Sequence, residues 1–312
     1  MKDEQLVSIL MNCFNGEKYL KEAVDSVFSQ TYKNWELVFW DNQSTDNSAD
    51  IFNSYDDPRL KYYYAPEHTD LGGGRACAWP YLRGDFVAIL DTDDVWLPTK
   101  LERQIPFFDD SDVGIVISDT LFFNENNEKP LYGKDFPAKG WVFEELLEQY
   151  FVSLETVVIR KETALKLDYA FDPEFSFIAD FDLVLRMSRI SKLALCPEVL
   201  AKWRVHGESD TWKYPEAFYE EKNRWVKKLV EKNPLVLEKY FQSISKFQNQ
   251  NDRTKIILTI VQGDRLLAIK KLLSTNFDHW HSWVLLLLCL LPFSKKILLI
   301  YYKRKISLNS IF

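Results

Sequence analysis

The chain has 312 residues, of which 46% are hydrophobic and 15% are aromatic, so it can bury a large core and is not a disordered protein. Its formal net charge of −7 excludes general nucleic-acid binding, which needs a basic surface. The cysteines are scattered, without the spacing of a zinc site or a disulfide framework, which suits a reducing compartment. The N-terminus lacks the long apolar region of a signal peptide, so we expect a cytoplasmic protein.

The first part of the chain alternates strand-like and helix-like segments. Strands are expected over residues 6–11, 35–40, 60–64 and 86–90. Helices are expected from residue 17 onward, after Ser44 or Thr45 as a cap, and from Arg75 to Leu82 after a glycine triplet. This alternation predicts an α/β fold with a mostly parallel, doubly wound sheet.

The second part is less regular and ends in helices. Helices are expected over 98–108, 142–150 and 179–190, and strands over 113–118 and 156–159. Beyond Pro215 the pattern is helical, with charged faces. We therefore expect a core domain over residues 1–214 and a helical extension over 215–278.

Three carboxylates follow the apolar run 86–90 within one turn, Asp91-Thr92-Asp93-Asp94. Open α/β sheets bind ligands at the carboxyl ends of their strands. So much negative charge is unfavourable unless a cation neutralises it, and carboxylate oxygens suit Mg²⁺ and Mn²⁺. The alternative is an acidic helix cap that leads into Pro98.

Two further loops follow expected strands. Asp41 would lie beside the first strand end at Asn12 to Asn15, where a carboxylate can accept a hydrogen bond from a nucleobase or a ribose. An ordinary polar loop with an Asx turn is the alternative for Asp41. The glycines 72–74 before Arg75 would let the backbone approach a diphosphate, although a flexible turn is the default for such a run.

Two pairs of residues in the second part also have the chemistry of a site. Asp180 and Asp182 fall in the first turn of the helix 179–190, where the helix dipole favours carboxylates with or without catalysis. Their side chains point about 200° apart, so we expect only one of them to face a site. Arg204 and His206 share one face of an extended segment and suit an anion or a metal-bound phosphate, although a lone histidine is more often structural.

In their order along the chain, these segments resemble the inverting glycosyltransferases of family 2, which have the GT-A fold. Residues 7–20 and 25–32 match the family's first strand and helix, and Asp41-Asn42-Gln43-Ser44-Thr45-Asp46-Asn47-Ser48 matches its nucleoside-binding loop. The turn Asp91-Thr92-Asp93-Asp94 is similar to its DxD motif, with Arg75 nine residues before Gly84, as in the family. Residues 179–186 are similar to its catalytic helix, and Arg204-Val205-His206 with Ser209 to its Arg-x-His-x-x-Ser segment. The resemblance covers roughly residues 5–210.

The resemblance implies a role for each matching residue. Asp180 is the implied base that takes the proton from an acceptor hydroxyl, with Asp182 as the second choice. Asp93, helped by Asp91 and His206, is implied to hold Mn²⁺ or Mg²⁺ against the diphosphate. The implied donor-binding residues are Asn12, Asn15, Asp41, Arg75, Asp91, Thr92 and Arg204. The chain departs from the family at Ala76, where an asparagine is usual, and at Ala179, where an acidic residue commonly precedes the catalytic aspartate.

The resemblance also implies the architecture and the reaction. We expect a GT-A fold with a mostly parallel central sheet, in which about 1–118 bind the nucleotide-sugar and about 119–214 carry the acceptor and catalytic half. The implied reaction moves a sugar, with inversion, from a nucleotide-diphospho-sugar to a hydroxyl of a lipid-linked saccharide or a cell-surface glycan precursor. The alternatives are a sugar-phosphate nucleotidyltransferase, whose Gly-rich, Arg-bearing loop is absent after the first strand, and a non-catalytic nucleotide-sugar-binding scaffold.

The last segment, residues 279–312, combines apolar runs with basic residues and has no acidic residue. The apolar run 284–293 is about half of the roughly 20 residues that a spanning helix needs, and two lysines follow it. Tryptophans at one end and the basic stretch 303–305 at the other suit an interfacial attachment, the alternative being a buried helix pair or an oligomer contact. We therefore expect a cytoplasmic protein that is peripheral on the inner face of the cytoplasmic membrane.

Overall fold

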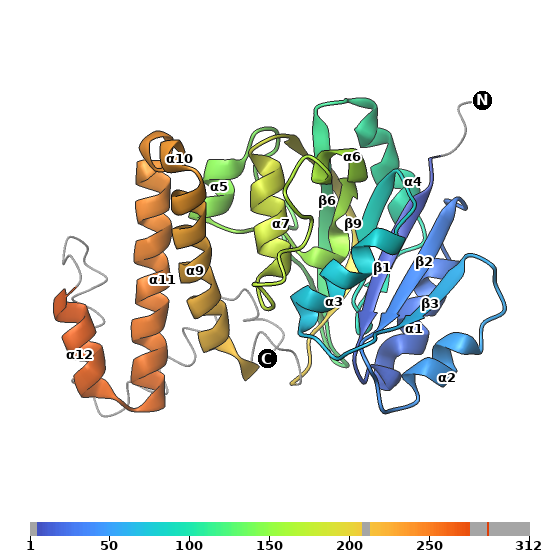
Figure 1. Ribbon diagram of the computed structural model, residues 1–312, viewed down its shortest axis with the longest axis horizontal. Coiled ribbons are helices and arrows are strands. Elements are labelled where there is room, and N and C mark those ends of the chain that lie inside the picture. Colours follow the sequence, from blue (N-terminus) through green and yellow to red (C-terminus); the bar gives the residue numbers. More distant parts are fainter. Residues whose placement is uncertain (1–4, 208–212, 275–285, 287–312) are drawn as a thin grey trace. The chain divides into compact units, whose positions relative to one another are not determined.

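The computed structural model describes residues 5–207, 213–274 and 286 (Figure 1). The chain divides into two compact units, Met1–His206 and Gly207–Phe312, each of which is described here by itself. None of the helices in the described ranges is long and apolar enough to cross a membrane. The segment 279–312 lies outside the described residues except for Leu286, which packs against an apolar cluster of the second unit.

The described part of the first unit forms one nine-stranded sheet in the order β3-β2-β1-β4-β8-β6-β9-β5, with β7 beside β6. The strands are β1 (Val7–Cys13), β2 (Trp35–Asp41), β3 (Leu60–Tyr64), β4 (Phe86–Ile89), β5 (Val95–Trp96), β6 (Val113–Phe123), β7 (Glu128–Pro130), β8 (Val158–Arg160) and β9 (Lys192–Arg204). The helices are α1 (Glu17–Phe28), α2 (Ser48–Asn53), α3 (Leu71–Ala78), α4 (Lys100–Gln104), α5 (Phe143–Glu148), α6 (Lys161–Ala164) and α7 (Ala179–Ser188). Short 3₁₀ helices cover 79–81, 105–109 and 154–156.

The N-terminal half of this sheet is parallel, as predicted. β1 pairs with β2 on one side and β4 on the other, and β2 pairs with β3, all in parallel. β8 then runs antiparallel to both β4 and β6, while β6 and β9 are again parallel to each other. The mostly parallel α/β sheet is therefore confirmed, with antiparallel pairing confined to the strands beyond β4.

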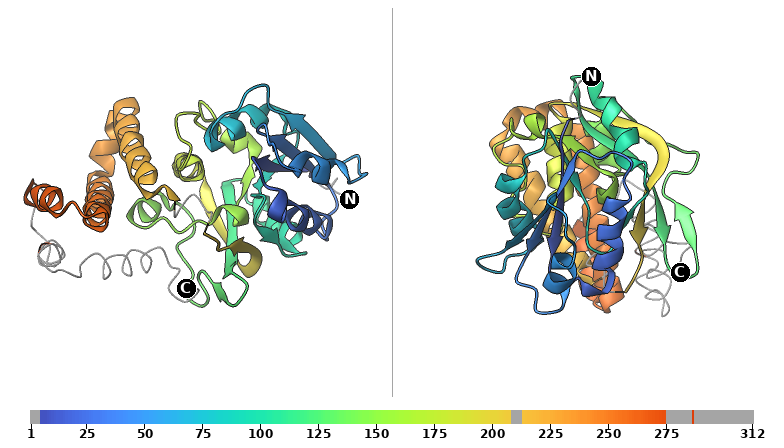
Figure 2. Two further views of the ribbon diagram at one scale, coloured as in Figure 1. Left: turned by 90° about the horizontal axis from the view of Figure 1, so that it is seen from below. Right: turned by 90° about the vertical axis from the view of Figure 1, so that its right-hand side faces the viewer.

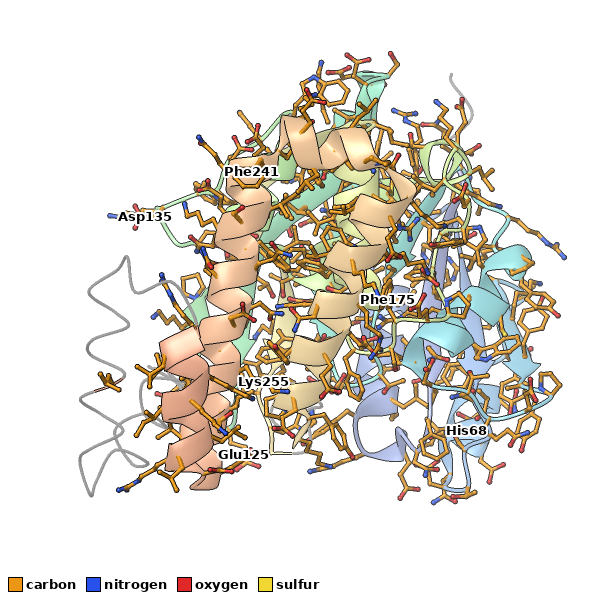
Figure 3. All side chains as sticks on the ribbon, turned by 60° about the vertical axis from the view of Figure 1, so that its left-hand side comes forward. His68, Glu125, Asp135, Phe175, Phe241 and Lys255 are labelled. Carbon is orange, nitrogen blue, oxygen red and sulfur yellow. The ribbon has the colours of Figure 1, made fainter. Side chains whose placement is uncertain are left out.

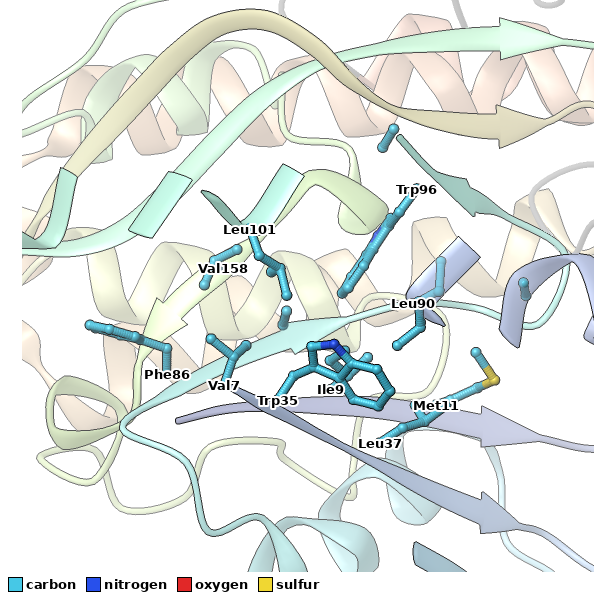
Figure 4. Packing of buried hydrophobic residues seen from close by; sticks show 14 of the residues in the cluster. Val7, Ile9, Met11, Trp35, Leu37, Phe86, Leu90, Trp96, Leu101 and Val158 are labelled. Atoms are coloured by element: carbon cyan, nitrogen blue, oxygen red, sulfur yellow. The ribbon is translucent and has the colours of Figure 1, made fainter. Parts of the chain in front are cut away.

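The core follows from the alternation of side chains along β1 (Figure 4). Val7, Ile9 and Met11 point to one face, where they pack with the apolar side of α1 in one buried cluster. The side chain of Asn12, on the opposite face, lies against Gly74 of α3, since a Cβ at that glycine would meet it at 2.9 Å. Helices thus cover both faces of the strands whose ends carry the candidate residues.

Strand β9, which contains Pro197, was not predicted from the sequence, where only an extended segment around Arg204 and His206 was expected. Proline has no N–H for a ladder and argues against a strand. The pairing of β6 with β9 shifts register where Ser118 pairs with Cys196 and Asp119 with Val199, so Pro197 falls in an irregularity that needs no regular ladder hydrogen bond. Beyond it the strand continues until Arg204 lies opposite Phe123.

The glycine run and the first loop cap differ from the predictions. The glycines lie inside α3 rather than in a turn before it, and the carboxylate of Asp70 caps that helix by accepting from the N–H of Gly73 at 2.7 Å. Helix α2 begins at Ser48, so neither Ser44 nor Thr45 caps it. The cap of α3 is local and was overlooked, whereas Ser44 and Thr45 are held in the loop by hydrogen bonds with Asn15.

Gly72 meets the segment before α7, near Phe175 (Figure 3). A Cβ at Gly72 would lie 1.9 Å from the carbonyl oxygen of Phe175, and the N–H of Leu71 donates to Ser176 Oγ at 3.2 Å. The absence of a side chain at Gly72 is therefore what lets α3 pack against the segment that leads into α7.

The described residues beyond position 212 are mainly helical, as predicted, in α9 (Pro215–Lys232), α10 (Pro234–Lys239), α11 (Phe241–Gln262) and α12 (Arg265–Ser274) (Figure 2). Trp225 of α9 meets Phe247 of α11, and Asn251 donates to Asn223 Oδ1 at 2.7 Å. Residues of α11 and α12 form the apolar cluster of this unit.

The contact at Gly72 makes a stability prediction. Gly72→Ala should destabilise the chain by about 1–3 kcal/mol, because the added methyl group overlaps backbone that must move. Gly207→Ala is the matched control, since a Cβ there meets no atom of the described residues within 4 Å. Thermal or urea unfolding of both variants measures the difference, and equal stability of the two would contradict the prediction.

Candidate functional site

The carboxyl ends of three parallel strands bring the predicted loops to one edge of the sheet. Cys13 of β1 is in register with Asp41 of β2, and Leu10 of β1 with Ile89 of β4. The turn 91–94 follows β4 directly. Because the strands are parallel and adjacent, the polar loops after them share this edge, where open α/β sheets bind ligands.

Asp91 is paired with Arg75 from α3. Arg75 Nη2 donates to Asp91 Oδ1 at 2.7 Å, and the Arg75 side chain is only 2% exposed. Desolvation raises the pKa of Asp91, the Arg75 charge opposes this rise, and the charges of Asp93 and Asp180 add to it. The Nε of Arg75 is buried and has no partner among the described residues, so this guanidinium keeps a free donor beside Asp91.

Asp93 meets His206, which follows β9. The distance from His206 Nε2 to Asp93 Oδ2 is 2.8 Å, and both side chains stay partly accessible. The described residues contain no group of three or more His, Cys, Asp or Glu side chains placed to hold a metal ion on their own. The Asp93 carboxylate fits a divalent cation that takes its remaining ligands from water and phosphate, as Mg²⁺ commonly does beside nucleotides, and the His206 imidazole nitrogen is a further ligand that suits a transition-metal ion better than Mg²⁺.

Asp94 does not cap a helix, contrary to the alternative drawn from the sequence. Helix α4 has Thr99 at its N-cap, and Asp94 is buried with its Oδ1 accepting from the backbone N–H of Arg204 at 2.9 Å. Desolvation raises the pKa of Asp94 well above its usual value, and the charges of Asp93 and Glu155 raise it further. Asp94 therefore joins the turn to the end of β9.

Hydrogen bonds hold Asp41, at the end of β2, and Asn15, in the loop after β1. Asp41 is fully buried, and its two carboxylate oxygens accept from the N–H of Ser44 at 2.7 Å and from Tyr62 Oη at 2.6 Å. Asn15 has a positive φ of 55°, and its Oδ1 accepts from the N–H of Thr45 at 2.8 Å. Both side chains thus shape the loops at this edge of the sheet.

Asn12 and Thr92 lie at the same edge. Asn12 is 9% exposed, and its Oδ1 has no hydrogen-bond partner among the described residues. Thr92 closes onto the start of α1, since a Cβ at Gly16 would lie 2.9 Å from its Oγ1. A buried, unpaired acceptor such as Asn12 Oδ1 is uncommon in folded proteins and points to a missing ligand or water.

Helix α7 separates its two aspartates, as predicted. Asp182 is 2% exposed and is bonded by Arg186 through Nε at 2.9 Å and Nη2 at 2.5 Å. Asp180 instead accepts from Tyr150 Oη at 3.1 Å, and its charge acts on Asp91. Asp182 is therefore a structural partner of Arg186, while Asp180 is bonded to Tyr150 and its charge contributes to the raised pKa of Asp91.

Three features of the site were not predicted from the sequence as donor-binding, metal-binding or catalytic residues. Phe14 follows Cys13, which pairs with Asp41 in the sheet, and its side chain is 52% exposed. Its ring centroid lies 4.4 Å from that of His68, which Figure 3 labels. Tyr150 bonds Asp180, and burial with that charge raises the pKa of Tyr150 well above its usual value. Glu155 is buried near Asp94. No periodic pattern marks any of the three, because each is defined by a neighbour distant in sequence.

A buried lysine lies behind the turn. Lys100 is fully buried, and its Nζ donates to Gln104 Oε1 at 2.7 Å and lies 4.4 Å from the Trp96 ring centroid. Desolvation lowers the pKa of Lys100 to about 7, although the charges of Glu155 and Cys196 act in the other direction.

The chain is similar in sequence to known glycosyltransferases. A family model described as "Glycosyl transferase family 2" matches residues 8–162. The chain is 28% identical over 223 residues to WfgD of Escherichia coli, a "UDP-Glc:alpha-D-GlcNAc-diphosphoundecaprenol beta-1,3-glucosyltransferase", across 72% of this chain and 85% of that protein. It is 34% identical over 136 residues to WfaP of Escherichia coli, which has the same activity in its name, across 44% of this chain and 50% of that protein.

Solved structures show the same fold. Residues 1–349 of TarS from S. aureus match with a TM-score of 0.63 at 18% identity, across 91% of this chain and 79% of that one. The mannosyltransferase PcManGT from Pyrobaculum calidifontis, solved with GDP-Man and Mn²⁺, matches with a TM-score of 0.60 at 15% identity, across 93% of this chain and 86% of that one.

Proposed function

The chain is a glycosyltransferase of family 2 with the GT-A fold, and we propose that it transfers a sugar, with inversion and with the help of a divalent metal ion, from a nucleotide-diphospho-sugar to a lipid-linked saccharide. The observation that carries the proposal is the turn after β4, where Arg75 is bonded to Asp91 and His206 to Asp93, while the charge of Asp180 helps to raise the pKa of Asp91. These groups come from α3, the turn after β4, α7 and the end of β9.

We propose that the nucleotide part of the donor lies across the ends of β1 and β2. The exposed ring of Phe14 gives a flat surface for a base, and Asp41 retains a second lone pair on each oxygen for a base N–H or a ribose hydroxyl. The unpaired Oδ1 of Asn12 supplies a further acceptor at the same edge. Asn15 and Thr92 hold the two loops that border this surface.

The diphosphate is proposed to lie beside Arg75 and Asp93. Asp93 and His206 would hold Mn²⁺ or Mg²⁺, which when bound stabilises negative charge on the departing nucleoside diphosphate. Arg75 has a free Nε donor next to Asp91 and directs fixed positive charge to the same place. The solved structure of PcManGT contains Mn²⁺, which supports this assignment.

Asp180 is proposed as the general base. Its carboxylate accepts one hydrogen bond from Tyr150, and Asp182 is committed to Arg186, so Asp180 is the carboxylate of α7 that remains to take a proton. A base held beside the donor site removes the proton of the acceptor hydroxyl as that oxygen attacks the anomeric carbon opposite the leaving phosphate. Tyr150 keeps the carboxylate in one orientation.

The acceptor is proposed to be a saccharide on a lipid diphosphate, because WfgD and WfaP are both named for such acceptors and for UDP-Glc as donor. Membership of family 2 argues against the nucleotidyltransferase alternative. The binding scaffold without catalysis remains to be tested, and donor hydrolysis in the presence of metal would exclude it.

We also propose that residues 279–312 bring the chain to a membrane surface. This proposal rests on the sequence alone, in which apolar runs alternate with basic residues and acidic residues are absent. Each basic residue near an anionic leaflet contributes on the order of 1 kcal/mol to binding. A membrane surface would also hold a lipid-linked acceptor at high local concentration.

The proposed base is tested by Asp180→Asn against Asp182→Asn. Asp180→Asn should lower transfer by about 10²–10⁴-fold with donor affinity nearly unchanged, because only proton removal is lost. Asp182→Asn should instead lower the free energy of unfolding, by about 3 kcal/mol, because it breaks a buried ion pair. Steady-state transfer rates and urea unfolding separate the two, and an Asp180→Asn enzyme with full activity would refute the assignment.

Donor and metal are tested together by thermal unfolding. UDP-Glc, UDP-GlcNAc and GDP-Man, each with and without Mn²⁺, are compared, since a ligand at 100 times its Kd stabilises the folded chain by about 2.7 kcal/mol. We expect one nucleotide class to raise the Tm, with a larger rise when Mn²⁺ is present. Asp93→Asn should abolish the extra rise that depends on Mn²⁺. A Tm rise independent of the metal would contradict metal dependence.

The tail is tested by deletion of residues 279–312. The shortened chain should no longer sediment with anionic vesicles, whereas the full chain should, and its transfer to a soluble acceptor should be retained. Unchanged sedimentation after the deletion would show that another part of the chain binds the vesicles or that the tail has a different role.

A further inference from the structure

The side chain of Arg204 is held on every side by residues distant in sequence. Its guanidinium carbon lies 4.3 Å from the Tyr19 ring centroid and 4.5 Å from that of Phe123, so two aromatic rings flank it. Nη2 donates to Glu22 Oε2 at 2.5 Å, and Nε donates to the backbone carbonyl of Asp93 at 2.9 Å. The side chain is 15% exposed, so these contacts define its orientation.

The four residues come from three elements that meet only in the folded chain. Tyr19 and Glu22 are three positions apart on α1 and therefore lie on the same side of that helix. Phe123 ends β6 and pairs with Arg204 at the end of β9. We call Tyr19, Glu22, Phe123 and Arg204 the Arg204 clamp.

The clamp holds the turn that carries the proposed metal ligand. Besides the bond from its side chain to the Asp93 carbonyl, Arg204 donates its backbone N–H to Asp94 Oδ1 at 2.9 Å. His206, two residues further, reaches Asp93 Oδ2, and its ring centroid is 5.4 Å from that of Tyr19. The backbone of Asp93 and the side chains of Asp93 and Asp94 are thus bonded to residues at or just after the end of β9.

Glu22 decides which way the guanidinium is directed. A guanidinium can bind a carboxylate with two parallel hydrogen bonds. Arg204 already contacts the backbone carbonyl of Asp93, so the carboxylate of the same residue is a competing partner. With Nη2 committed to Glu22, the fork is not available to Asp93. An arginine bound to the Asp93 carboxylate would compete directly with a cation there.

We propose that Glu22 is a positioning residue that acts through Arg204: it fixes the Asp93 backbone and keeps the guanidinium off the Asp93 carboxylate. Glu22 touches neither donor nor acceptor in this assignment. The proposal extends the proposed function, because its consequence for cation binding rests on Asp93 as a metal ligand, while its structural part stands without a metal.

The test compares Glu22→Gln with Asp25→Asn in the full chain. Asp25 lies on the same helix and forms an exposed ion pair with Lys21 at 2.7 Å, so Asp25→Asn removes a carboxylate charge from α1 without touching the clamp. Amide hydrogen exchange without metal, read at Asp94 and Arg204, reports how firmly the turn is held. Titration with Mn²⁺ in the presence of inorganic diphosphate, followed by electron paramagnetic resonance, reports the cation site without a choice of nucleobase.

Glu22→Gln should speed exchange at the Asp94 and Arg204 amides and raise the apparent Kd for Mn²⁺ about fivefold. That is the largest effect expected from the loss of a partly exposed ion pair. Asp25→Asn should change neither quantity. Arg204→Lys keeps the charge but loses the fork and the flat surface between the rings, and adding Glu22→Gln to it should have little further effect.

Equal exchange rates and equal Mn²⁺ affinities in Glu22→Gln and Asp25→Asn would overturn the proposal. Independent, additive effects of Glu22→Gln and Arg204→Lys would overturn it as well, because Glu22 would then not act through Arg204. If the unmodified chain binds no Mn²⁺ while Glu22→Gln still speeds exchange, the positioning role stands and the proposed metal dependence fails.

Discussion

The crowding of three carboxylates into the turn 91–94 is the constraint on which the rest of the structure depends. Like charges at such separations repel, and desolvation raises the pKa of Asp91 and of Asp94. Each carboxylate has a different partner: a guanidinium from α3, an imidazole from beyond β9, and a backbone N–H at the end of β9. The turn is stable because the fold brings three donors to one edge of the sheet.

The elements around the turn place these partners beside it. The glycine-rich start of α3 lets that helix approach both Asn12 and the segment before α7, so that the helix carrying Arg75 packs on the segment that leads to Asp180. β9 passes through the irregularity at Pro197 and then continues in register with β6, which places Arg204 and His206 beside the turn. Donor, metal and base positions in the proposed reaction are therefore coupled through packing rather than through one contiguous motif.

Local patterns predicted the parallel half of the sheet well, because buried apolar runs and the helices between them have clear periodicity. The same patterns predicted that only one aspartate of α7 would face the site, and the structure commits Asp182 to Arg186. They were wrong for the glycines of α3 and for Asp94 as a helix cap, since Asp70 and Arg204 supply the contacts that decide those positions. They missed β9, which contains a proline that the irregular pairing with β6 tolerates.

The sequence by itself determined which chemical groups are present, that they follow buried strands, and the family to which their order belongs. It could do so because strand and helix periods are local and because the turn 91–94, the two aspartates of α7 and the pair Arg204 and His206 stand in an order that resembles the family. Only the tertiary structure decided the partners: that Asp41 has both oxygens bonded, that Tyr150 holds Asp180, and that Glu22 meets Arg204. Those pairings depend on distances between elements far apart in sequence, and no local period encodes such distances.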